Sequence, residues 1–378
     1  MPEKTIEEIM ENITRILQLD PNNAKTYSKR GNLYCCNGDY DKAIKDYTQA
    51  ININPDYAHN YFLRGDAYCR KENYDKAIEN YTQAISLERN NAFYFCHRGR
   101  AYYNKNKYGK AIRNFNQAIN LKSNFAMFYN DRGHAYCCKK DFSKGIEDFT
   151  QAIQLDPNNA DYYFTRGNAY RHEKNDYDRA IEDFTQAINL ENNNAEYYGF
   201  RGRAYNYKGD FIKAIKDLIR AIKLDLENAD YYCWCGDAYY SKKYFDMAIE
   251  NYLKAISLKP KNANAYHGCS NAFYFKGEHD LARMGYMETI YLVSGVAETR
   301  YITGKVYLCE KNYDKAIEIF TQSIQSDPNH CGYHYWRSKA FYGKGEHNKA
   351  RADYEIVLRL NTKFWTSLAR KELKQLKE

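Results

Sequence analysis

The sequence repeats itself every 34 residues along almost its whole length. The stretch "DKAIENYTQAI", which begins at Asp75, returns with small changes at Asp41, Asp178 and Asp314. Ten such copies follow one another, and their starting positions differ by 34 residues at every step except one of 35. A fixed period of about 20 to 50 residues is typical of stacked units, each of which contacts its neighbours. We therefore expect one extended repeat domain rather than several globular domains.

Each unit contains two amphipathic segments when it is numbered from the residue that opens its upstream half, such as Ala58. In the first half, position 4 is usually aromatic, position 8 is usually Gly and position 11 is always Tyr or Phe. In the second half, position 20 is Ala in nine units, position 24 is large and position 27 is usually Ala. The spacings 4, 8, 11 and 20, 24, 27 each fall on one face of a helix. Small residues opposite large ones predict two closely packed antiparallel helices in each unit.

Two features mark the ends of the second helix. Asp is frequent at position 18, as in Asp41 and Asp75, and its carboxylate is expected to cap the first amides of that helix. Proline at position 32 is expected to end the helix before the next unit begins. Apart from Pro2, every proline occupies that position or its equivalent: Pro21, Pro55, Pro157, Pro260 and Pro328.

Positions 7 and 23 change together. Position 7 is Arg in seven units, and in those seven position 23 is Asp or Asn, as in Arg30 with Asp46 and Arg337 with Asp353. The two positions belong to different helices of one unit, so we expect a hydrogen bond or an ion pair between them. We interpret this pair as structural rather than as part of a ligand site.

The whole pattern resembles the tetratricopeptide repeat family, which has Gly at position 8, Tyr at 11, Ala at 20, an aromatic residue at 24, Ala at 27 and Pro at 32. The resemblance covers almost the whole chain. It implies an all-α fold, a right-handed α-α superhelix (solenoid) of about ten tetratricopeptide-like helix-turn-helix repeats whose first helices line the concave side. Members of the family usually serve as protein-binding scaffolds.

The resemblance also divides the chain. We expect ten tandem repeats over residues 24–364, an N-terminal half-repeat or capping helix over 1–23, and a C-terminal capping helix over 365–378, because a solenoid must cover its open apolar ends. The unit at 263–296 is degenerate, with Ser270 in place of Gly, and is a place where the superhelix could bend.

Composition excludes several classes of protein. No stretch of about 18 apolar residues is present, and the first residues lack the apolar core of a secretory signal. The 11 cysteines, an odd number without an export signal, indicate reduced thiols and a cytoplasmic protein. The net charge of +8 comes without any block of about five or six like charges, so no nucleic-acid-binding tail is expected.

No pattern in the sequence points to catalysis, to a cofactor or to a metal. The adjacent pair Cys35 and Cys36 lacks the C-x-x-C spacing of a zinc site, and His330 and His334 lack the glutamate of a zincin motif. A phosphate-binding loop, a nucleophile elbow and a constellation of paired acids are also missing from the sequence. We expect a non-enzymatic protein without a metal site.

The residues that vary between units form a second stripe on the first helix, at positions 2, 5, 9 and 12. Position 9 is polar in every unit, which fits an exposed face, and the resemblance places this stripe on the concave groove. We predict that the groove binds a protein or peptide partner. The candidate partner-binding residues are Asn32, Asp66, Arg70, Arg100, Tyr103, His134, Asn168, Arg171, Arg203, Asp237, Lys305 and Lys339.

Two alternatives concern the partner. Chaperone-binding relatives bind a terminal carboxylate with Lys at position 5 of one unit and Asn at position 6 of the next. This chain has Ser28 and Leu63 at those two positions, so no Hsp70/Hsp90-type carboxylate clamp is expected. The runner-up function is RNA binding, since the chain is net basic and helical-repeat relatives with a 35-residue period read bases. The dominant 34-residue period and the acids scattered through the stripe favour a protein partner.

Overall fold

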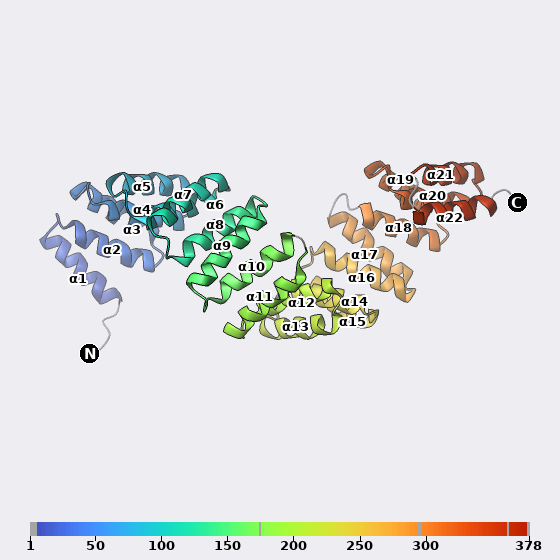
Figure 1. The fold of residues 1–378 in the computed structure, drawn as a ribbon, viewed down its shortest axis with the longest axis horizontal. Helices are drawn as coiled ribbons and strands as arrows, with labels where there is room; N and C mark the ends of the chain where they lie inside the picture. Colours follow the sequence, from blue (N-terminus) through green and yellow to red (C-terminus); the bar gives the residue numbers. More distant parts are fainter. Residues whose placement is uncertain (1–5, 174, 293–296, 361–362, 376–378) are drawn as a thin grey trace. The chain divides into compact units, whose positions relative to one another are not determined.

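The structure, a computed structural model, describes residues 6–173, 175–292, 297–360 and 363–375. These residues form 22 α-helices, and no strand occurs among them (Figure 1). Neighbouring helices pack in pairs, so the all-α repeat fold is confirmed. Three parts of the predicted elements lie outside the described residues: 1–5 and 376–378 of the capping segments, and 293–296 at the end of the degenerate unit.

The helices belong to two compact units, Met1–Asn192 and Asn193–Glu378. The helices of the first unit are α1 (Ile6–Leu19), α2 (Ala24–Cys36), α3 (Tyr40–Ile53), α4 (Ala58–Arg70), α5 (Tyr74–Leu87), α6 (Ala92–Asn104), α7 (Tyr108–Leu121), α8 (Ala126–Cys138), α9 (Phe142–Leu155), α10 (Ala160–Glu173) and α11 (Tyr177–Leu190). The helices of the second are α12 (Ala195–Lys208), α13 (Phe211–Leu224), α14 (Ala229–Ser241), α15 (Phe245–Leu258), α16 (Ala263–Lys276), α17 (His279–Leu292), α18 (Ala297–Cys309), α19 (Tyr313–Ser326), α20 (Cys331–Gly343), α21 (His347–Leu360) and α22 (Lys363–Gln375).

Gly at position 8 lets the two helices of a repeat approach around the ring at position 24. A Cβ atom built on Gly65 would lie 2.8 Å from Cε1 of Tyr81, and one built on Gly133 would lie 2.7 Å from Cε1 of Phe149. Both rings are buried almost completely. The predicted packing of small residues against large ones is therefore confirmed, and its closeness explains why position 8 is so rarely anything but Gly.

The expected cap at position 18 is wrong. The second helix begins at position 17, so the cap is position 16, where the side chain of Asn73 accepts a hydrogen bond from the amide of Lys76. Position 18 already lies within the helix, and its carboxylate points to the next repeat, where Asp41 pairs with Lys71 at 2.5 Å. Asp246 pairs with Lys276 in the same way, at 2.7 Å.

The pairing of positions 7 and 23 is confirmed. Nε of Arg132 donates to Asp148 at 2.8 Å and Nη2 donates to the other carboxylate oxygen at 2.6 Å. A direct hydrogen bond joins the two positions in all seven repeats that have Arg. In addition, Nη1 of Arg132 donates to Asn116, at position 25 of the preceding repeat, at 2.7 Å. We call this three-point contact the arginine link; it joins both helices of one repeat to the repeat before it.

Candidate functional site

The candidate residues lie on the side of each unit where the first helices of successive repeats contact one another. In the first unit α2, α4, α6 and α8 make such contacts in turn, and in the second unit α12, α14 and α16 do so. We call this side the inner face. Eight candidates, from Asn32 to Arg171, belong to Met1–Asn192, and four, from Arg203 to Lys339, belong to Asn193–Glu378.

Side chains at position 9 of the inner face reach the next first helix. Nε of Arg100 on α6 lies 2.7 Å from a carboxylate oxygen of Asp131 on α8. The carboxylate of Asp66 on α4 contacts His97 on α6 at 3.6 Å and Arg70 on its own helix at 3.1 Å. The close contact with His97, followed by the hydrogen bond from Arg70, lowers the pKa of Asp66. These charges are therefore already paired within the protein.

Position 6 is a part of this surface that the sequence analysis missed. It supplies His97 and Asp131, the partners of Asp66 and Arg100, and it is Trp234 in another repeat. Its changes from unit to unit were visible in the sequence. The sequence alone does not show that position 6 contacts position 9 of the preceding repeat, as His97 and Asp131 do.

Two cations of the second unit are held by aromatic rings. The guanidinium carbon of Arg203 lies 4.9 Å from the centre of the Trp234 ring. Nζ of Lys305 lies 4.9 Å from Trp336 and 5.4 Å from Tyr274. Burial lowers the pKa of Lys305. Within the described part of the chain neither cation forms an ion pair with a carboxylate, unlike Lys339, whose Nζ lies 3.1 Å from Glu372 on α22.

Some polar residues at position 9 serve the core instead. The side chain of Asn32 accepts a hydrogen bond at 2.7 Å from the hydroxyl of Tyr47, the buried residue at position 24 of the same repeat. Asp237 accepts one at 2.7 Å from Tyr252 in the equivalent place, and burial raises the pKa of Asp237. Position 9 therefore has a second role in these repeats: Asn32 is exposed and Asp237 is partly exposed, yet each also supplies the acceptor that the hydroxyl of a buried tyrosine needs.

Position 24 correlates with position 9 in eight of the ten repeats, the exceptions being Phe184 with Asn168 and Tyr354 with Lys339. Four repeats have Phe or Leu at position 24 together with a basic residue or His at position 9: Phe115 with Arg100, Phe149 with His134, Leu218 with Arg203, and Phe320 with Lys305. A ring or side chain without a hydroxyl needs no acceptor, so position 9 is free to carry a cation or an imidazole. His134 packs edge to face on Phe149 at 5.2 Å, and burial lowers the pKa of His134.

The remaining candidates interact within the first unit. The hydroxyl of Tyr103 on α6 lies 3.2 Å from Sγ of Cys138 on α8. Arg171 lies along its own helix, where Nη2 is 3.4 Å from the amide oxygen of Asn168 and 3.0 Å from Nε2 of His172. These contacts place the three candidates on the inner face without bringing them into one compact site.

The described residues show no site for a metal. No group of three or more His, Cys, Asp or Glu side chains in the described ranges is arranged to hold an ion. All eleven cysteines are free thiols. None of the helices in the described part of the chain combines the length and the apolar character that crossing a bilayer requires.

The fold and the inner face together define a helical repeat protein. Sequence models described as tetratricopeptide repeat match residues 22–90, 160–194 and 297–330, and models described as TPR repeat match 99–137, 133–171, 202–243 and 236–277. The chain therefore belongs to the tetratricopeptide repeat family, as the sequence pattern indicated. Its general function follows from the family: it is a scaffold for protein–protein interaction.

The similar solved structures support the fold and nothing further. The chain is similar to pilF of Pseudomonas aeruginosa, with 17% identity over 57% of this chain and 97% of that chain and a TM-score of 0.51. It is similar to yeast Tom70, with 17% identity over 98% of this chain and 92% of that chain and a TM-score of 0.47. It is also similar to MamA, with 31% identity over 42% of this chain and 93% of that chain and a TM-score of 0.40. No curated protein sequence matches the chain.

Proposed function

We propose that the protein binds a protein or peptide partner along the inner face, and that Arg203 and Lys305 receive carboxylate groups of that partner. The observation that carries the proposal is the contrast between these two cations and the paired Arg100 and Lys339. Arg203 and Lys305 are held by indole rings at 4.9 Å and form no ion pair with a carboxylate among the described residues.

A ring-held cation is suited to receive a carboxylate. The ring fixes the side chain and excludes part of its water, so a partner loses less freedom and less solvation when it binds. The ring faces engage the cation without occupying its hydrogen-bond donors. Nη2 of Arg203 donates to the hydroxyl of Tyr207 at 3.3 Å, and the other donors of its guanidinium remain available for a charge-assisted bond. Trp, Tyr and Arg are also the residues enriched where interfaces concentrate their binding energy. Trp234 and Trp336 would then provide apolar contact beside the charge.

The ion pairs of the first unit weigh against RNA as the partner. Binding of a phosphate backbone depends on cations that neutralise successive phosphates. Arg70 and Arg100 are already paired with Asp66 and Asp131, and these acids lie on the same face. The eleven free thiols support our further proposal that the protein works in the reducing environment of the cytoplasm.

The test begins with affinity capture from the native cell and identification of the partner by mass spectrometry. Isothermal titration calorimetry then compares the purified partner on the wild type and on the double variant Arg203→Gln/Lys305→Met. Because a hydrogen bond to a charged group contributes about 1.5 to 3 kcal/mol, we expect at least about a tenfold weaker affinity.

The matched control is Lys45→Gln/Arg113→Gln. It removes the same two charges from exposed positions on the second helices α3 and α7. The control should bind the partner as the wild type does. Equal affinity of the wild type and the Arg203→Gln/Lys305→Met variant would refute the proposed role of the inner face of the second unit.

A further inference from the structure

Three successive repeats lack the arginine link. Position 7 is Cys235 in the first of them, Cys269 in the second and Thr303 in the third, all buried. Position 25 of each preceding repeat changes at the same time. In the linked repeats, Thr or Asn at position 25 accepts a hydrogen bond from the arginine. In the repeats before Cys235, Cys269 and Thr303, position 25 is instead apolar, with Ile219, Leu253 and Met287.

The loss of the link does not explain apolar residues at position 25. Without the arginine, position 25 no longer has to accept a hydrogen bond, but its side chain is still exposed to water. The exposed fraction is 37% for Ile219, 50% for Leu253 and 45% for Met287. These three large apolar side chains therefore each leave a substantial part of their surface in water.

Further exposed apolar side chains accompany them on the same helices. Ile212 on α13, Met247 on α15 and Met284 on α17 are exposed, with 70% of Ile212 and 66% of Met284 accessible. With Ile219, Leu253 and Met287 they form what we call the outer patch. α5 shows the usual pattern, with Asp75, Glu79 and Thr82 at positions 18, 22 and 25. Soluble proteins seldom expose a group of large apolar residues without a binding function.

The α13 part of the outer patch is also basic. Ile212, Ile215 and Ile219 line an open hollow of about 430 Å³ together with Lys216, Arg220 and Lys223. None of these three exposed cations forms an ion pair with a described residue, and the one acid of α13, Asp217, is buried in its pair with Arg201. On α11 the positions of Ile212, Lys216 and Ile219 hold Asp, Glu and Thr, so both charge and polarity reverse at α13.

We propose that the outer patch docks an amphipathic helix of a partner protein, whose apolar side chains enter the hollow on α13 and whose Asp and Glu residues pair with Lys216, Arg220 and Lys223. A helix that lays its apolar face into a groove is a common mode of recognition, and the unpaired cations select acidic flanks. The methionines on α15 and α17 add a contact surface that adapts to its partner.

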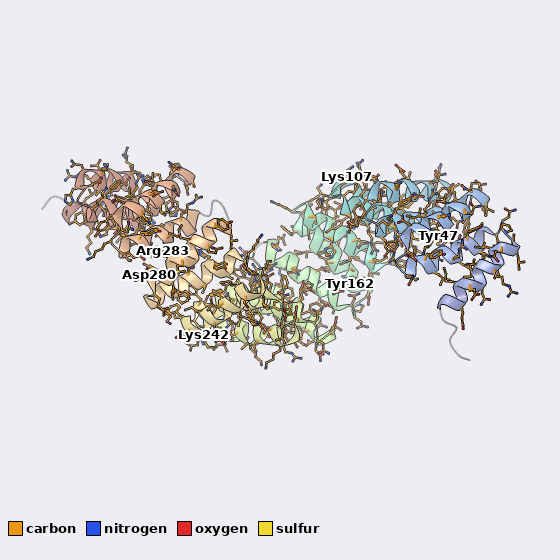
Figure 2. All side chains as sticks on the ribbon, turned by 180° about the vertical axis from the view of Figure 1, so that it is seen from behind. Tyr47, Lys107, Tyr162, Lys242, Asp280 and Arg283 are labelled. Atoms are coloured by element: carbon orange, nitrogen blue, oxygen red, sulfur yellow. The ribbon has the colours of Figure 1, made fainter. Side chains whose placement is uncertain are left out.

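An anionic membrane fits this surface less well. α15 adds the exposed Glu250 to it, and α17 adds Asp280 and Glu288. An anionic bilayer over the whole patch would meet these acids, whereas the acidic flanks of a helix seated on α13 lie beside Lys216, Arg220 and Lys223. Asp280 forms an ion pair with Arg283 on α17, with 3.2 Å between Nη2 of the arginine and Oδ1 of the aspartate. Figure 2 labels both residues. A hollow lined by isoleucines also suits protruding side chains better than a flat lipid surface. The inference does not depend on the inner face, because the outer patch lies on the second helices.

The test uses a designed, fluorescein-labelled helical peptide of about 18 residues with Leu along one face and Glu on both flanks. Fluorescence anisotropy measures its affinity for the full chain. The principal variant is Ile212→Asp/Lys216→Glu/Ile219→Thr, which gives α13 the residues that α11 has at these positions. Its fold should be retained because the same three residues occur in α5 and α11, and circular dichroism checks this.

We expect the wild type to bind the acidic peptide at least about tenfold more tightly than the variant does, with an affinity that falls as salt is raised. A second variant, Lys216→Gln/Lys223→Gln, keeps the apolar residues and should also weaken binding. The inner-face variant Arg203→Gln/Lys305→Met should bind this peptide as the wild type does, which separates the outer patch from the proposed function.

Four results would overturn the inference. The first is that the wild type binds a peptide with Lys in place of Glu as tightly as the acidic peptide, and the second is that the wild type and the triple variant bind the acidic peptide equally. The third is that the inner-face variant no longer binds the acidic peptide. The fourth is that the protein sediments with phosphatidylserine vesicles and does not bind the peptide. Self-association of the wild type that the triple variant abolishes, without peptide binding, would also overturn it and would assign the patch to a second copy of this chain.

Discussion

Replacement of Asp148 by Ala tests whether the arginine link stabilises the solenoid. Asp148 is 5% exposed and accepts two hydrogen bonds from Arg132, whose side chain is 20% exposed. Truncation leaves the guanidinium half-buried, with only its bond to Asn116. Breaking a buried pair costs about 3 to 5 kcal/mol, and the access of water to Arg132 reduces our expectation to about 2 to 3 kcal/mol.

Urea unfolding followed by circular dichroism measures this loss of free energy of unfolding, and a double-mutant cycle separates its causes. Arg132→Met/Asp148→Leu removes both charges, and it should be clearly less destabilising than Asp148→Ala because no unpaired charge stays buried. Affinity for a captured partner should not change. A loss below about 0.5 kcal/mol for Asp148→Ala, or an equal loss in the double variant, would refute the reasoning.

Two further predictions concern the core. Burial raises the pKa of Asp237, so stability from this group is present at acid pH and is lost as the pH rises through that pKa. Asp237→Asn should keep the bond from Tyr252 and remove this pH dependence, so thermal melts over a range of pH should show that the gain in melting temperature of the variant over the wild type grows as the pH rises. Gly65→Ala would place a Cβ atom 2.8 Å from the Tyr81 ring, so urea unfolding should show a loss of about 1 to 3 kcal/mol in the free energy of unfolding. Gly109→Ala is the control: its Cβ would meet no atom within 4 Å, and it should be neutral or stabilising. Equal effects of the two substitutions would contradict the packing argument.

Most of the fold follows from the sequence because the same physical requirement is written ten times. Each repeat must bring two helices together around one ring, so Gly65 with Tyr81 and its equivalents recur at fixed spacing. The pair of Arg132 with Asp148 was also predictable, since its two members vary together. The cap was not, because positions 16 and 18 are both often Asp and only the start of the helix at position 17 decides which of them caps it.

The candidate site was predictable by position but not by role. The sequence locates Arg100 and Asp237 on the same stripe, yet Arg100 contacts the next repeat and Asp237 accepts a bond from its own core. The partner of Arg100, Asp131 at position 6, belongs to another repeat and can be found only once the distance between first helices is known. Periodicity gives no information about such contacts.

The core of each repeat decides whether its inner face is free to vary. The tyrosines Tyr47, Tyr252 and Tyr286 at position 24 donate their hydroxyl hydrogen bonds to Asn or Asp at position 9, whereas among the described residues the hydroxyls of Tyr81 and Tyr354 make no such bond. Phe320 has no hydroxyl, and the Lys305 above it turns instead to the rings of Trp336 and Tyr274. In this repeat, the absence of the hydroxyl leaves position 9 free to carry a charge for a partner. The outer patch follows the same logic, because loss of the arginine at position 7 frees position 25. In both places, residues suited to recognition occur where a structural hydrogen bond is absent.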